Sequence, residues 1–127
     1  MPIIKKVIDK LIKKNISISV AESCTGGLLA NTITKYSGVS KIFSYGVISY
    51  SNKAKSKYLS VSRTNLSKFG AVSKEVAEDM INGLYTNEKT QICISTTGIA
   101  GPNGGTKLKP VGSVSYTHLT LPTILLV

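Results

Sequence analysis

Residues 21–27, AESCTGG, limit the possible folds of this chain most, because they place polar side chains and two glycines between a strand-like and a helix-like segment. Residues 16–20 alternate apolar and polar side chains, the period of a half-buried strand, and residues 28–36 carry apolar side chains at helical spacing. Ser23 is therefore expected where a strand ends and a helix begins. In open α/β sheets ligands bind at this edge, where the helix start offers unpaired N–H groups.

Strand and helix patterns alternate along the rest of the chain. An apolar stripe predicts a helix over residues 3–12. Further helices are expected over residues 51–59, 64–69 and 73–85, and further strands over residues 42–50, 91–96 and 111–116. Strands joined through helices pair in parallel by right-handed crossovers. We therefore expect one layered α/β domain with a mostly parallel sheet.

The net charge of +10 is a feature shared with many nucleic-acid binders. Here the lysines are spread along the chain and Arg63 is the one arginine, with no arginine-rich stripe or interleaved aromatic platform. Nucleic-acid binding is therefore not favoured, although a basic surface would also attract a phosphorylated metabolite. No apolar run reaches the roughly 18 residues of a membrane span, and no secretory signal is present, so we expect a cytoplasmic chain without a membrane partner.

Cysteine and histidine are too sparse for a disulfide scaffold or a zinc site. Cys24 and Cys93 do not lie in a CxxC or Cys/His cluster, and His118 has no partner at ligand spacing. We therefore expect no metal.

Ser23 is the leading nucleophile candidate, because a serine at a strand-to-helix turn presents its hydroxyl beside N–H groups that stabilise an oxyanion. The alternative interpretation is that Ser23 or Thr25 simply caps the helix. With one histidine near the chain end, a lysine whose pKa is lowered by burial is the natural base.

Lys55 is the candidate for that base. At 100° per residue Lys53 and Lys57 share one helix face and Lys55 points about 200° from Lys53. The hydroxyl of Tyr50 is close enough in sequence to position the proton. The alternatives are that Lys55 is an ordinary solvated lysine and that Cys24, with Glu22 and Lys55, is the nucleophile. Cys24 is otherwise a packing thiol, and Glu22 a carboxylate that bonds backbone N–H groups.

Residues 97–105, TGIAGPNGG, form a glycine-rich turn after a predicted strand. They match neither GxxxxGK[ST] nor GxGxxG, so no nucleotide-triphosphate or dinucleotide site is indicated. Their glycines suit a phosphate or ribose held by backbone amides, or a plain wide turn. Because both loops follow strands at the carboxyl edge, we expect them to meet in one crevice.

Four motifs together resemble the C-terminal domain of the competence/damage-inducible CinA family. They are AESCTGG (21–27), GVISYSNKAK (46–55), GAVS (70–73), and TGIAGPNGG (97–105) followed by KPVG (109–112). The resemblance implies a three-layer α/β/α sandwich with a mostly parallel sheet, and a nicotinamide-mononucleotide amidase that uses neither metal nor cofactor. It also implies Ser23 as nucleophile, Lys55 as base and Tyr50 as an assisting residue.

The substrate would be a small-molecule nucleotide, with its phosphoribosyl part held by two loops. The expected binding residues are Thr25, Gly26, Gly27, Thr97, Gly98, Ile99, Ala100 and Gly101. By the same resemblance the chain forms a homo-oligomer. Residues 1–116 are expected to be an incomplete domain, and residues 117–127 a non-matching apolar tail of artefactual origin. If the truncation removes activity, the alternative function is that of a non-catalytic nucleotide-binding module.

Overall fold

Four strands form one open sheet in the computed structural model, which describes residues 2–120. The strands lie in the order β2-β1-β3-β4, with bounds β1 (Ile18–Glu22), β2 (Tyr45–Ile48), β3 (Ile92–Gly98) and β4 (Val114–Thr120). β1 pairs in parallel with both β2 and β3, whereas β4 is antiparallel to β3. The expected mostly parallel sheet is therefore confirmed.

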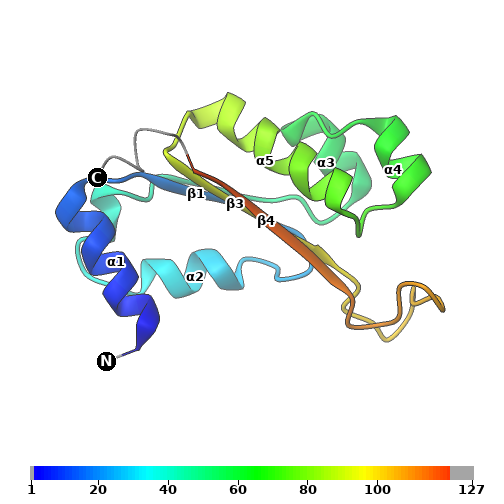
Figure 1. Ribbon diagram of the computed structural model, residues 1–127, viewed down its shortest axis with the longest axis horizontal. Coiled ribbons are helices and arrows are strands. Elements are labelled where there is room, and N and C mark those ends of the chain that lie inside the picture. Colours follow the sequence, from blue (N-terminus) through cyan, green and yellow to red (C-terminus); the bar gives the residue numbers. More distant parts are fainter. Residues whose placement is uncertain (1, 121–127) are drawn as a thin grey trace.

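Helices cover both faces of this sheet, which gives the expected three layers. α1 (Ile3–Lys14) and α2 (Leu28–Thr34) lie on one face, and α3 (Asn52–Leu59), α4 (Arg63–Phe69) and α5 (Lys74–Glu88) lie on the other (Figure 1). A short 3-10 helix, η1 (Val39–Lys41), precedes β2. Within residues 2–120, no helix is long and apolar enough to cross a membrane.

β1 is buried along its whole length, so the expectation of a half-buried strand is wrong. Ile18 and Val20 pack in the core cluster beneath α1 and α2, and Ala21 packs in the cluster beneath α5. The polar Ser19 is tolerated because its hydroxyl bonds the hydroxyl of Thr90 and also contacts the Cys93 thiol. Helices on both faces, rather than an exposed face, explain the burial.

α5 packs closely on α3 because Gly83 has no side chain. A Cβ at Gly83 would lie 1.8 Å from the carbonyl oxygen of Leu59, which is an impossible contact. This packing holds α3 against the sheet, and α3 carries Lys55.

The last strand begins and ends later than expected. β4 starts at Val114 rather than Val111, and residues 117–120 extend the antiparallel pairing to residues 92–95 of β3. The remaining residues of the expected apolar tail, 121–127, lie outside the described residues.

Candidate active site

Ser23 and Lys55 meet at the carboxyl edge of the sheet. Ser23 directly follows β1 and is 5% exposed, and Lys55 lies on α3 and is 1% exposed. Lys55 Nζ is 2.9 Å from Ser23 Oγ, although the residues are 32 positions apart in the chain. The two side chains predicted as nucleophile and base are thus within hydrogen-bond distance of each other.

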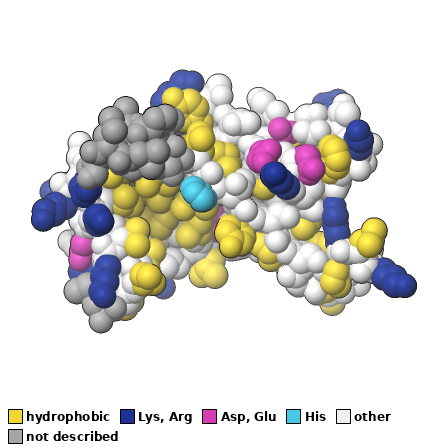
Figure 2. Space-filling model, viewed as in Figure 1, with side chains coloured by type: hydrophobic (Ala, Val, Ile, Leu, Met, Phe, Trp, Pro, Cys, Tyr) yellow, Lys and Arg dark blue, Asp and Glu magenta, His cyan; other side chains and the backbone are white. Residues whose placement is uncertain are grey.

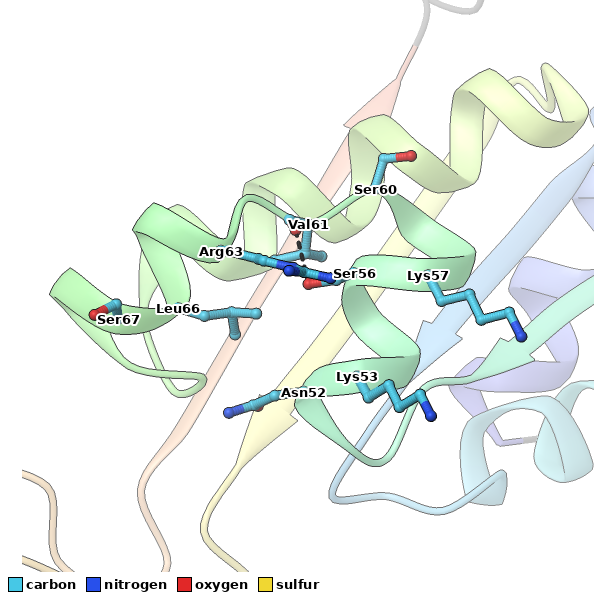
Figure 3. Close-up of a pocket in the computed structure, with 9 residues that line it drawn as sticks. All are labelled: Asn52, Lys53, Ser56, Lys57, Ser60, Val61, Arg63, Leu66 and Ser67. Carbon is cyan, nitrogen blue, oxygen red and sulfur yellow. Dashed lines mark hydrogen bonds between the residues drawn. The ribbon is translucent and has the colours of Figure 1, made fainter.

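The phase of α3 directs Lys55 inward, as the sequence predicted. Ser51 caps the helix by accepting a hydrogen bond from the N–H of Ala54. Lys53 and Lys57 are exposed and lie on one side of α3, pointing away from α4 (Figure 3). An ordinary solvated lysine is therefore the wrong description of Lys55.

Three acceptor atoms surround the Lys55 amine: Ser23 Oγ at 2.9 Å, the Ser49 carbonyl at 3.0 Å and the Tyr50 carbonyl at 3.1 Å. A neutral amine has two N–H donors and one lone pair. The protonated amine donates to all three acceptors. In the neutral amine the two carbonyls, which only accept, would take both donors, and the lone pair would be left for the Ser23 hydroxyl. Burial lowers the pKa of Lys55 from its ordinary value of 10.5, and the electrostatic interaction with Cys24 opposes this shift.

Tyr50 reaches the site through its backbone and not through its hydroxyl. Its carbonyl accepts from Lys55 and lies 3.5 Å from Ser23 Oγ. Its side chain is 65% exposed, and its hydroxyl bonds no residue in the part of the chain that the structure describes. The prediction that the Tyr50 hydroxyl positions the proton therefore has no support from a contact in the described residues.

Glu22 is the residue that caps α2. Its buried carboxylate accepts from the N–H of Leu29 and the N–H of Ala30, each at 2.9 Å, and from the Thr25 hydroxyl at 2.6 Å. Neither Ser23 nor Thr25 caps the helix, so that alternative is wrong. The prediction that Glu22 bonds backbone N–H groups and fixes the turn is confirmed.

The turn after Ser23 retains unpaired backbone donors. The N–H of Gly26 bonds the Ser23 carbonyl, and the N–H of Leu28 bonds the Thr25 carbonyl. The N–H groups of Cys24, Thr25 and Gly27 have no protein acceptor among residues 2–120. Two of them directly follow the nucleophile candidate, where an oxyanion would form.

The two loops expected to share a crevice touch each other. Thr25 Oγ1 is 2.9 Å from Thr96 Oγ1 of β3. The Cys24 thiol lies so close to Gly98 that a Cβ there would be 2.8 Å from the sulfur. Gly98 is therefore needed for loop packing, and Cys24 is half-buried and packs against it.

The predicted binding residues of the second loop are mostly occupied by protein contacts. The Thr97 hydroxyl is buried and donates to the Ala71 carbonyl at 2.9 Å. Ile99 exchanges two backbone hydrogen bonds of 2.8 Å with residues 112 and 113, and Gly101 packs against Val111. Ala100 is exposed. In the first loop, Gly26 and Gly27 have φ of 58° and 101°, values that favour glycine.

Two contributors to this edge escaped sequence reasoning: the Ser49 carbonyl, which orients the Lys55 amine, and Thr96, which bonds Thr25. A backbone acceptor has no residue-type signal. Thr96 does carry a signal in the sequence, since it is a polar residue directly before the glycine-rich turn and thus near the carboxyl end of its strand.

A hollow of about 820 Å³ lies on the outer side of α3, between α3 and α4 (Figure 3). Its lining includes Lys53, Lys57 and Arg63, but neither Ser23 nor Lys55. It is separate from the Ser23 site, because Lys55 reaches Ser23 from the opposite side of the helix. Within residues 2–120 no three His, Cys, Asp or Glu side chains are grouped to hold a metal ion.

Known proteins resemble this chain in sequence. A model of the CinA C-terminal domain matches residues 1–120. A protein of Clostridium perfringens, provisionally named a competence-damage inducible protein, is 51% identical over 122 residues, which are 95% of this chain and 29% of that protein. A CinA-like protein of Kosmotoga olearia is 55% identical over 108 residues, 85% of this chain and 26% of that protein. The chain thus spans less than a third of these relatives.

Solved structures resemble it in fold as well. A competence/damage inducible protein of Agrobacterium tumefaciens has a TM-score of 0.89 and 37% identity, covering 92% of this chain and 71% of that chain. A CinA superfamily protein of Escherichia coli has a TM-score of 0.87 and 32% identity, covering 92% of this chain and 68% of that chain. On the match across residues 1–120, the chain belongs to the family of the CinA C-terminal domain.

Proposed function

We propose that the chain is an amidohydrolase that converts nicotinamide mononucleotide to nicotinate mononucleotide and ammonia in pyridine-nucleotide salvage. The observation that carries the proposal is the 2.9 Å separation of Ser23 Oγ from the buried Lys55 amine, whose pKa is lowered by burial. A serine needs a neutral base to attack a carboxamide, and a lowered pKa favours the neutral amine. The substrate comes from the resemblance to the CinA family.

In the first half-reaction Ser23 Oγ attacks the carboxamide carbon while its proton moves to Lys55 Nζ. The N–H groups of Cys24 and Thr25 stabilise the oxyanion of the tetrahedral intermediate. The C–N bond then breaks, and Lys55 gives its proton to the nitrogen, which leaves as ammonia. An acyl ester on Ser23 remains.

In the second half-reaction Lys55 takes a proton from water, and the hydroxide attacks the ester carbon. The tetrahedral intermediate collapses, the proton returns to Ser23 Oγ, and nicotinate mononucleotide leaves. The phosphoribosyl part lies along the turn 25–27 and the loop 97–101. The hydroxyls of Thr25 and Thr97 are bonded to protein, so the N–H of Gly27, which has no protein acceptor among residues 2–120, is the donor of this turn that remains for the substrate.

Replacing the nucleophile tests the proposal. We expect Ser23→Ala to lower kcat/KM for ammonia release by about 10⁴-fold, because the hydroxyl that forms the acyl ester is removed. Cys24→Ala, the matched control one residue later, should retain activity. The reverse result would assign the chemistry to Cys24.

Two other functions would give different experimental results. A non-catalytic module would bind the mononucleotide and release no ammonia. A nucleic-acid binder would show DNA affinity that falls steeply with salt. Lys and Arg side chains are scattered around the visible face and do not gather in one patch (Figure 2), so this second alternative has less support.

A further inference from the structure

In the hydrogen bond between the Thr25 and Thr96 hydroxyls, the donor can be assigned. Thr25 Oγ1 lies 2.6 Å from Glu22 Oε1 and 2.9 Å from Thr96 Oγ1. A threonine hydroxyl has one proton, and the Glu22 carboxylate already accepts two backbone N–H groups, so the Thr25 proton lies on the bond to Glu22. Thr96 must therefore donate to Thr25. The result is a chain of donors that runs from Thr96 through Thr25 to Glu22.

These hydrogen bonds connect β3 with the turn that follows Ser23. Thr96 lies on β3, two residues before Gly98, against which the Cys24 thiol packs. Thr25 lies in the turn that carries the free N–H groups of Cys24 and Thr25, and Glu22 holds the start of α2. The orientation of the turn therefore depends on a side chain of the neighbouring strand.

We propose that Thr96 is a positioning residue for the amidase reaction, an inference that rests on the proposed function. Its hydroxyl orients Thr25 and, through Thr25, the Glu22 carboxylate. These contacts fix the N–H groups of Cys24 and Thr25 toward the oxyanion of the acylation step. Thr25 accordingly acts on the substrate through its backbone, since its hydroxyl proton is committed to Glu22.

The test compares Thr96→Val with Thr96→Ser in the full chain. Valine keeps the shape and favours a strand, so the fold is retained while the hydroxyl is lost. We expect Thr96→Val to lower kcat about 10-fold with KM changed less than about two-fold, because a turn without this hydrogen bond aims its N–H groups less well at the oxyanion of the transition state. Thr96→Ser should restore most of kcat. Thr86→Val, on the exposed face of α5, is the matched control and should change neither constant.

Two kinetic results would overturn the proposal. One is an unchanged kcat in Thr96→Val. The other is an equal loss in Thr96→Ser and Thr96→Val, which would assign the effect to packing of the methyl group.

A second measurement does not depend on turnover. Amide hydrogen exchange at Leu29 and Ala30, the two N–H groups held by Glu22, should accelerate several-fold in Thr96→Val and not in Thr86→Val. Exchange at the wild-type rate would refute the positioning role. If the wild-type chain releases no ammonia, the amidase proposal fails, and the exchange result alone decides whether Thr96 orders the turn.

Discussion

The start of α2 differs from the starts of α3, α4 and α5 in the residue that satisfies the first N–H groups. A helix leaves these donors unpaired. In α3, α4 and α5 the serine directly before the helix accepts one of them; these serines are Ser51, Ser62 and Ser73. In α2 the acceptor is Glu22, at the end of the preceding strand.

The difference changes what the serine at each position can do. A capping serine has its oxygen engaged by backbone, as Ser73 Oγ is by the N–H of Val76. Ser23 does not stand at the N-cap of α2, which is Gly27, and its hydroxyl faces the Lys55 amine. The same residue type thus stabilises a helix at three places and is available for chemistry at the fourth.

Among the variants that test this comparison, Glu22→Gln should have the largest effect on stability and activity. The amide has one acceptor oxygen, whereas Leu29, Ala30 and Thr25 present three donors, so at least one buried donor would face the new NH₂ group. We expect a loss of about 3 kcal/mol in the free energy of unfolding and a large loss of ammonia release. Urea denaturation measures the loss in the free energy of unfolding, and amide exchange in α2 shows whether the start of this helix is loosened.

Glu78→Gln is the matched control for that variant. Glu78 lies on α5 and pairs with Lys74 at the surface, so its loss should change stability by less than about 1 kcal/mol. Equal stability of Glu22→Gln and Glu78→Gln would show that Glu22 does not hold α2.

Alanine substitutions at Ser73 and Ser23 should have smaller effects on stability and should differ in their effect on activity. Ser73→Ala removes the cap of α5 and should cost about 1 kcal/mol of stability while ammonia release is retained. Ser23→Ala should show the opposite pattern, with activity lost and stability changed by about 0.5 kcal/mol or less, because a neutral Lys55 amine keeps both carbonyl acceptors. A stability loss in Ser23→Ala as large as in Ser73→Ala would contradict the comparison.

Much of this arrangement followed from local patterns in the sequence. The phase of residues 53–57 separates Lys55 from its neighbours, and the residue types around Ser23 predict the strand-to-helix turn there. The burial of β1 on both faces and the antiparallel direction of β4 were not predicted, because both depend on which elements pack together.

The details of the candidate site that escaped prediction are also non-local. The Tyr50 carbonyl accepts from Lys55, and the Ala71 carbonyl accepts from the Thr97 hydroxyl. Both contacts use backbone carbonyls, which every residue carries. A sequence pattern that marks Tyr50 or Thr97 as polar cannot say whether the side chain or the carbonyl faces the site.

The most direct test of the account is the titration of Lys55 in the full chain by ¹⁵N NMR of its side-chain amine, assigned by its absence in Lys55→Met. Burial predicts a midpoint below 10.5, and Cys24→Ala should lower it further because the electrostatic interaction with Cys24 raises this pKa. Since only the neutral amine accepts the Ser23 proton, kcat/KM should rise with pH through the same midpoint. A midpoint at or above 10.5 would show that Lys55 remains charged and would contradict its role as the base.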